Sequence, residues 1–201
     1  FEQKNVEIFA KYSSIHVING LTDIYHPCQA LADLFTISEL GFLDSELKFA
    51  YVGDCNNVSN SLIIGFLKLG LNMNVGCSKE YGPSKEILDY IDSQSGKNGG
   101  KINFIYEPYE AVLNADIIYT DVWISMGDKN SDKKINKLMP FQVNKKMLTY
   151  AKPEVKIMHC LPAHRNMEIT SEIIDSSHSV VWQQAENRLH AQKALLVYLF
   201  S

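Results

Sequence analysis

The sequence lacks several features that would define its class directly. No apolar run is long enough to cross a bilayer, and no stretch has the pattern of a signal peptide. Lysines and arginines form no basic stripe, and the net charge is −4 at pH 7. Internal repeats and low-complexity tracts are also absent. We therefore expect a cytoplasmic protein that binds neither a membrane nor nucleic acid.

Cysteine is scarce and widely spaced. The four cysteines, Cys28, Cys55, Cys77 and Cys160, form no C-x-x-C pair, so we expect free thiols of a reducing compartment rather than disulfides. The histidine and cysteine spacings match no zinc pattern, and the turn at 53–57 lacks the glycines of a G-x-G-x-x-G nucleotide loop. We therefore expect no metal and no cofactor.

What is present is an alternation of short apolar runs and amphipathic stretches. The 201 residues are 46% hydrophobic and 21% charged, which is typical of a globular protein with a sizeable core. Strands are predicted at residues 15–18, 48–52, 72–77, 101–106, 116–120, 155–159 and 179–182. Helices are predicted at residues 27–40, 57–69, 84–93, 108–114, 133–138, 144–151, 170–175 and 186–200. This order predicts an α/β fold, with a doubly wound parallel sheet flanked by helices.

The pattern also predicts two parts of unequal size. We place a boundary at residues 41–48, so that residues 1–41 form the tail of a second α/β domain with its linking helix, and residues 42–201 form the main domain. The first residues already have helical spacing without a preceding cap. We therefore expect further residues before Phe1.

Four polar clusters follow predicted strands, at residues 19–29, 53–57, 121–127 and 160–165. In doubly wound sheets, ligands bind beyond the carboxyl ends of the strands. We therefore expect the four clusters to meet along one edge of the sheet.

Two of these clusters suit a carboxylate or an amine. Asn56 and Asn57 begin a helix, so one amide is expected to cap it while the other is available to a ligand. Asp121 follows a strand and can either hold an ammonium group or cap its own loop.

One further cluster suits an anion or a polarised carbonyl, and the other contains a thiol whose role is open. His26 and Gln29 begin a helix, whose amino end favours negative charge, although His26 is equally compatible with a capping role. Cys160 is compatible with a low-pKa nucleophile, a ligand contact or a packing role, but its strand neighbour His159 should point to the opposite face. Arg188, at the start of the last predicted helix, can fork onto a phosphate or pair with a surface carboxylate.

Taken together and in order, segments 19–33, 53–61, 121–127, 159–165 and 186–188 resemble the ornithine carbamoyltransferases. Their sequences include His26-Pro27-Cys28-Gln29, a Ser125-Met126-Gly127 loop and His159-Cys160-Leu161-Pro162. The resemblance implies transfer of a carbamoyl group from carbamoyl phosphate to the δ-amine of L-ornithine, without cofactor or metal.

The resemblance also implies the role of each matching residue. Those implied to bind carbamoyl phosphate are His26, Pro27, Cys28, Gln29, Cys160, Leu161 and Arg188. Those implied to bind ornithine are Asn57, Asp121, Ser125 and Met126. Those implied to be catalytic are Asp121, Cys160 and His26.

Members of this family carry an N-terminal domain with a Ser-x-Arg-Thr phosphate loop and assemble as homotrimers. That loop is absent from this sequence. Three alternatives therefore remain: a carbamoyltransferase for putrescine or an acylated ornithine, a non-catalytic remnant that binds amino acids, and, more distantly, a nucleotide-dependent oxidoreductase.

Overall fold

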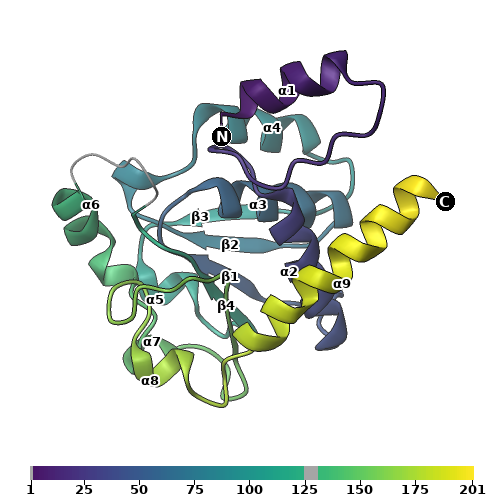
Figure 1. The fold of residues 1–201 in the computed structure, drawn as a ribbon. Helices are drawn as coiled ribbons and strands as arrows, with labels where there is room; N and C mark the ends of the chain where they lie inside the picture. The colour runs from purple at the N-terminus through teal and green to yellow at the C-terminus, as the bar shows by residue number, and fades with distance from the viewer. Residues whose placement is uncertain (1, 125–130) are drawn as a thin grey trace.

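The computed structural model describes residues 2–124 and 131–201 and shows a three-layer α/β arrangement (Figure 1). The central sheet has five parallel strands: β1 (Phe49–Val52), β2 (Met73–Gly76), β3 (Ile102–Ile105), β4 (Ile117–Thr120) and β5 (Lys156–His159). The described α-helices are α1 (Gln3–Tyr12), α2 (Pro27–Glu39), α3 (Asn57–Leu69), α4 (Lys85–Gln94), α5 (Pro108–Ala111), α6 (Ser131–Leu138), α7 (Lys145–Leu148), α8 (Ser171–Ile174) and α9 (Val181–Phe200). Two short 3-10 helices are η1 (Lys79–Tyr81) and η2 (Met139–Phe141).

The strand order is β3-β2-β1-β4-β5, so β1 is the central strand, with β2 and β3 on one side and β4 and β5 on the other. Phe49 of β1 is in register with Met73 on one side and with Ile117 on the other. Because every pair is parallel, all five strands end at the same edge of the sheet. The predicted doubly wound α/β fold is confirmed.

Each face of the sheet carries its own apolar core, because successive strand residues point to opposite faces. Phe49 and Tyr51 of β1 belong to the core beneath α2, α3 and α4. Ala50 and Val52 belong to the core beneath α5, α7 and α8. Strands covered on both faces read as continuous apolar runs, which explains why the sequence shows little polar alternation.

Two predicted strands are not strands. Residues 15–18 form a connection without strand structure, and Ile15 is 72% exposed, so its apolar side chain does not pack against a sheet. At residues 179–182, a single bridge joins Ser179 to Ile157, and α9 then begins at Val181 rather than at residue 186. Both runs are too short to show by periodicity alone which structure they adopt.

The helices α2 and α9 lie side by side on one face of the sheet (Figure 1). Among the described residues, none of the helices is long and apolar enough to cross a membrane. The four cysteines are free, as predicted.

Candidate active site

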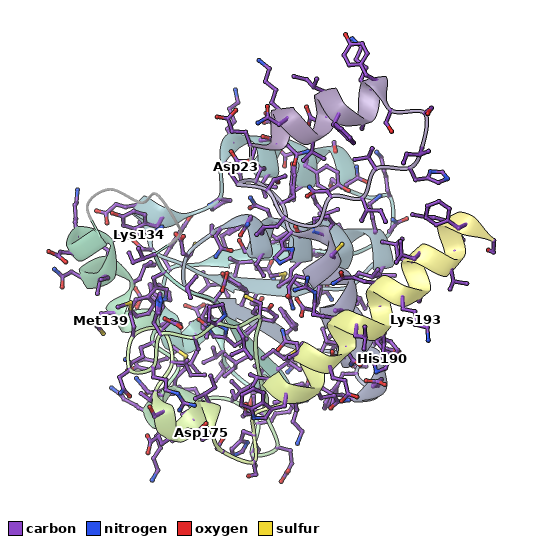
Figure 2. The ribbon with its side chains drawn as sticks, in the orientation of Figure 1. Asp23, Lys134, Met139, Asp175, His190 and Lys193 are labelled. Atoms are coloured by element: carbon purple, nitrogen blue, oxygen red, sulfur yellow. The ribbon has the colours of Figure 1, made fainter. Side chains whose placement is uncertain are left out.

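The carboxyl ends of β1, β4 and β5 bring three of the predicted clusters together. The turn after β1 begins at Gly53, whose φ of +131° strains any other residue and whose close approach to Trp123 leaves little room for a side chain. An added Cβ there would lie 3.1 Å from Trp123 Nε1. Lys134 of α6 (Figure 2) braces the same turn, since its Nζ lies 2.8 Å from Asp54 Oδ2.

Asn56 joins this turn to β4. Its Oδ1 accepts hydrogen bonds from Val58 N and Ser59 N, which caps α3. Its Nδ2 donates to Asp121 Oδ2 at 2.6 Å. The neighbouring Asn57 instead donates to the carbonyl of Thr22, at 2.7 Å. One amide therefore caps the helix, as predicted, but the same amide also orients Asp121.

Asp121 and Cys160 form the contact between β4 and β5. Cys160 Sγ donates to Asp121 Oδ1 at 2.8 Å, and Val122 N donates to the same oxygen at 2.7 Å. Burial raises the pKa of the Cys160 thiol well above its usual range, and the adjacent charge of Asp121 raises it further. A thiol held in this way is protonated at neutral pH, which argues against a thiolate nucleophile.

His159 has a structural role. Leu161 N donates to its Nδ1 at 2.8 Å, so the proton of the neutral ring belongs on Nε2, which lies 3.1 Å from Glu168 Oε1. Ligand atoms of Asp121, His159 and Cys160 lie within 4.8 Å of one another, a proximity that the sequence did not predict. Both ring nitrogens of His159 are already engaged, so this cluster does not offer a ready metal site.

The segment before α2 reaches the same edge without being a strand. His26 N donates to Ser61 Oγ of α3 at 2.7 Å, and Asn60 Nδ2 donates to the carbonyl of Ile24 at 3.0 Å. Pro27 occupies the first turn of α2, where its missing N–H is not needed. Burial lowers the pKa of His26, and the charge of Arg188 lowers it further. A neutral imidazole therefore stands at the amino end of α2.

Gln29 and Arg188 meet across the pair of helices. Gln29 is 1% exposed, and its Oε1 accepts a hydrogen bond from Arg188 Nη1 at 2.6 Å. Arg188 lies within the body of α9, not at its start as predicted. Its Nε is buried and has no hydrogen-bond partner in the described structure. Gln29 thus positions the guanidinium of Arg188, and the Nε of Arg188 is still available as a donor.

The remaining predicted residues fall into three groups. The thiol of Cys28 faces away from the site, because its Sγ donates a hydrogen bond to the carbonyl oxygen of Asn19 at 3.4 Å. Leu161 is half-buried in a left-handed conformation, with φ of 55°, directly after Cys160. Ser125 and Met126 lie outside the described residues.

Residues that the sequence reasoning missed lie beneath the site. Asp33, Tyr119 and Gln184 are fully buried and hydrogen-bonded to one another. Gln29 and Asp33 are four residues apart on a helix, a spacing that places them on one face. That spacing was the available signal for Asp33.

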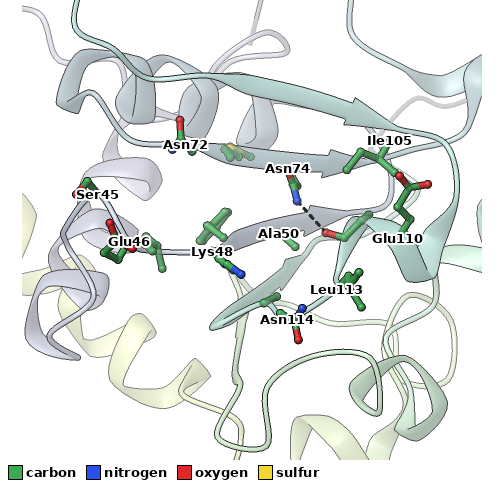
Figure 3. Close-up of a pocket in the computed structure, with 15 residues that line it drawn as sticks. Ser45, Glu46, Lys48, Ala50, Asn72, Asn74, Ile105, Glu110, Leu113 and Asn114 are labelled. Atoms are coloured by element: carbon green, nitrogen blue, oxygen red, sulfur yellow. Dashed lines mark hydrogen bonds between the residues drawn. The ribbon is translucent and has the colours of Figure 1, made fainter.

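A separate cavity of about 510 Å³ lies at the opposite edge of the sheet, between α5 and the amino ends of the strands (Figure 3). Asn74 Nδ2 donates to the carbonyl of Ala111 there, at 3.4 Å. None of the predicted site residues lines this cavity.

The geometry defines a class of protein whose site consists of two complementary half-sites at one edge of the sheet. His26, Gln29 and Arg188 offer a neutral ring, an amide and a cation, which suits an anion or a polarised carbonyl. Asp121 offers a carboxylate, which suits an ammonium group. The charge of Arg188 lowers the pKa of His26 and the charge of Asp121 raises it, so the imidazole is within the electrostatic influence of both halves.

The chain belongs to the aspartate/ornithine carbamoyltransferase family. The model of that family's Asp/Orn binding domain matches residues 45–199, and the model of its carbamoyl-P binding domain matches residues 1–39. The sequence is 50% identical over 197 residues to the ornithine carbamoyltransferase of Thermococcus kodakarensis, covering 98% of this chain and 62% of that protein. It is 50% identical to the ornithine carbamoyltransferase of Bacillus thuringiensis, covering 100% of this chain and 63% of that protein.

Solved structures agree with the sequence comparison. The ornithine carbamoyltransferase of Pyrococcus furiosus superposes with a TM-score of 0.91 at 47% identity, covering 98% of this chain and 63% of that chain. The anabolic ornithine carbamoyltransferase of Campylobacter jejuni gives 0.93 at 37% identity, covering 98% and 66%. The chain thus spans less than two thirds of the length of the curated relatives it matches.

Proposed function

We propose that this chain supplies the amino-acid-binding part of an ornithine carbamoyltransferase, which converts carbamoyl phosphate and L-ornithine into L-citrulline and phosphate. The observation that carries the proposal is the pairing of a cation-and-amide half-site with a carboxylate half-site at one sheet edge. An anionic carbamoyl donor and a cationic amine need these two environments side by side.

In the proposed reaction, His26, Gln29 and Arg188 hold the carbamoyl donor. Gln29 and Arg188 donate to oxygen atoms of the donor, and His26 stabilises the negative charge that develops on the carbonyl oxygen. Pro27 and Cys28 contribute through the backbone at the amino end of α2, since the Cys28 thiol is bonded to Asn19 O. Leu161 lines the space between the substrates.

Asp121 and Cys160 act on the amine. The δ-ammonium group resembles lysine, with a pKa of about 10.4, so it must lose a proton before it attacks. Asp121 accepts this proton, and the Cys160 thiol, which donates to Asp121, fixes the orientation of the carboxylate. The amine nitrogen then bonds to the carbonyl carbon, and the bond from that carbon to the phosphate oxygen breaks. Asn57, Ser125 and Met126 bind the amino-acid end of ornithine.

We further propose that residues 1–41 belong to a carbamoyl-phosphate domain and residues 42–201 to an ornithine domain. No residue of α1 is buried, although Phe9 is apolar. An apolar groove of about 710 Å³ runs along α2 and α3, where Leu31 and Phe35 are exposed. The remainder of a carbamoyl-phosphate domain covers these surfaces in the proposed enzyme, which is a cytoplasmic homotrimer.

A chimera tests the proposal. The amino-terminal part of the Thermococcus kodakarensis relative that this chain does not match is joined to residues 1–201. The carbamoylated product is then measured with each amine: citrulline from ornithine, carbamoylputrescine from putrescine and acetylcitrulline from acetylornithine. The intact relative is the matched control. Light scattering gives the assembly state. Citrulline formation from ornithine, without carbamoylation of putrescine or acetylornithine, supports the proposal.

Two outcomes contradict it. Turnover with putrescine or acetylornithine in place of ornithine identifies a sibling carbamoyltransferase. A folded, trimeric chimera that binds ornithine without turnover identifies a non-catalytic amino-acid-binding protein.

A further inference from the structure

One face of α3 is polar and largely buried. Asn57, Asn60 and Ser61 lie at positions i, i+3 and i+4 of the helix, so their side chains share one face. Asn60 is 7% exposed and Ser61 is 6% exposed. Buried polar side chains need hydrogen-bond partners, and the cap of α3 is already supplied by Asn56. The partners of the other three residues therefore show which segment this face holds.

The segment is the connection of residues 22–26, which leads into α2. Asn57 Nδ2 donates a hydrogen bond to the carbonyl of Thr22 at 2.7 Å. Asn60 Nδ2 donates to the carbonyl of Ile24 at 3.0 Å. Two side-chain amides of one helix face thus hold two successive carbonyls of the connection.

Ser61 makes the third bond, and its hydroxyl acts both as a donor and as an acceptor. Its Oγ accepts a hydrogen bond from His26 N at 2.7 Å. The same Oγ donates to the carbonyl of Asn57, four residues earlier in the helix, at 2.9 Å. A hydroxyl that donates its one proton within the helix keeps its lone pairs for the amide of His26. The bond within α3 therefore orients the oxygen that receives this amide.

The backbone of His26 is anchored on both sides. Its N–H donates to Ser61, and its carbonyl accepts hydrogen bonds from Gln29 N at 3.1 Å and from Ala30 N at 3.2 Å, at the start of α2. Its side chain does not cap the helix, and the Nδ1 of the ring is buried without a hydrogen-bond partner in the described part of the chain. The placement of the imidazole therefore depends on the two backbone anchors.

These bonds also join the two parts of the chain. The connection that carries His26 falls in the part that matches the carbamoyl-P binding domain, residues 1–39. The helix α3 falls in the part that matches the Asp/Orn binding domain, residues 45–199. Three hydrogen bonds from about one turn of α3 thus cross between the two parts next to the site.

We propose that Ser61 is a positioning residue that holds His26 at the site from the neighbouring domain. Ser61 acts through the backbone amide of His26 rather than by contact with a substrate. The catalytic role of His26 rests on the proposed function, whereas the anchoring by Ser61 rests on the hydrogen bonds. Loss of the hydroxyl leaves the amide of His26 without its acceptor, so the start of α2 and the imidazole move together.

The first test needs no substrate. The imidazole of His26 is titrated by NMR in the 201-residue chain, and the spectrum of His26→Gln assigns its signal. Burial and the charge of Arg188 lower the pKa of His26 from its ordinary value of 6.5, while the charge of Asp121 raises it. In Ser61→Ala the ring is held less firmly and is more accessible to water, so at least half of the net depression of the pKa should be lost. Exchange of the His26 amide with D₂O should accelerate by roughly tenfold, because its hydrogen bond is lost.

The matched control is Ser59→Ala. Ser59 is 0% exposed on the same helix, and its Oγ donates to the carbonyl of Asn56 at 2.8 Å, so the control removes a buried hydroxyl that is bonded within α3. Positioning predicts both changes in Ser61→Ala and neither in Ser59→Ala. Ser61→Thr keeps a hydroxyl that can make the same bond within the helix, so it should restore the parent values. Unchanged titration and exchange in Ser61→Ala, or equal changes in Ser59→Ala, overturn the proposal.

The second test is a double-mutant cycle in the chimera. Ser61→Ala should lower kcat by roughly tenfold, which is part of the 10²- to 10³-fold that loss of an oxyanion donor costs. The KM for ornithine should change less than about twofold, because the half-site of Asp121 is not altered. In the His26→Gln chimera, Ser61→Ala should not lower kcat further, since the residue that it positions is gone. An equal loss in both backgrounds shows a general structural role and overturns the proposal.

The two hypotheses fail separately. A chimera without citrulline formation contradicts the proposed function, while the titration and exchange results still decide the role of Ser61. Ser61→Cys is the second variant if Ser61→Ala does not fold, because its side chain has a similar shape and its sulfur is a weak acceptor. It should show the same two changes to a smaller extent, and parent values in both measurements contradict the anchoring.

Discussion

Cys160 Sγ donates a hydrogen bond to Asp121 Oδ1 at 2.8 Å, across the ends of β5 and β4. The Cys160 thiol therefore acts as a hydrogen-bond donor to the Asp121 carboxylate. A nucleophilic cysteine instead needs a neighbouring cation. Burial raises the pKa of Cys160, and the negative charge of Asp121 adds to that effect.

The first prediction concerns this pair. Asp121→Asn removes the adjacent charge, so the pKa of Cys160 should fall and its alkylation by iodoacetamide at pH 8 should accelerate. Mass spectrometry of the Cys160 peptide measures the rate. Asp44→Asn, an exposed carboxylate remote from the site, is the charge-matched control. Equal rates in the two variants would show that Asp121 does not control the thiol.

The second prediction concerns turnover in the chimera. Asp121→Asn should lower kcat for ornithine by roughly 10²- to 10⁴-fold, because the base that accepts the amine proton is lost. The affinity for phosphonoacetamide, a stable analogue of carbamoyl phosphate, should change less than twofold. Steady-state kinetics and calorimetry measure both quantities. Substantial residual activity would assign the proton to another acceptor.

The third prediction separates two functions of Asn56. Asn56→Ser retains a side-chain oxygen that caps α3 but loses the amide donor to Asp121. Asn56→Ala loses both. We expect Asn56→Ala to lower the free energy of unfolding by about 1 kcal/mol and Asn56→Ser to lower it by less. In the chimera, both should raise the KM for ornithine. A normal KM in Asn56→Ser would mean that the amide does not orient Asp121.

The fourth prediction follows from the buried carboxylate. The pKa of Asp33 is raised from 3.8 to about 7, so the folded state binds more protons than the unfolded state between those pH values. The free energy of unfolding therefore falls as the pH rises through this window, by up to ~4 kcal/mol. Asp33→Asn should abolish this decline. Urea unfolding at pH 5 and pH 8 measures it, and an equal decline in both proteins would contradict the pKa.

The fifth prediction concerns Gly53. Its φ of +131° strains any other residue, and an added Cβ would lie 3.1 Å from Trp123 Nε1. We expect Gly53→Ala to lower the free energy of unfolding by roughly 2–3 kcal/mol. Gly96→Ala is the control, because Gly96 has a φ of +75° in open space, so only about 1–2 kcal/mol is expected there. A smaller loss at Gly53 than at Gly96 would refute the steric argument.

Most of the fold was predictable because the sheet is buried on both faces. Five apolar runs became five strands, and their parallel orientation followed from the helices between them. The two errors, at residues 15–18 and 179–182, are short apolar runs without a sheet partner along their length. Their structures depend on contacts with distant residues, and local periodicity does not contain that information.

The site was predictable in outline because the strands of the sheet are parallel. Parallel strands end at one edge, so Asp121 and Cys160 had to approach each other once β4 and β5 were paired. The layer beneath was not predictable. Asp33 and Gln184 are hydrogen-bonded at 2.7 Å but are 151 residues apart in the sequence. No local pattern specifies such a contact.

The hydrogen bond between Gln29 and Arg188 joins residues 159 positions apart. During synthesis, α2 leaves the ribosome long before α9 exists, because chains grow at about 5–20 residues per second. Roughly ten to thirty seconds of synthesis therefore separate the two residues of this hydrogen bond. Translation of α9 is thus the step that completes the half-site formed by His26, Gln29 and Arg188.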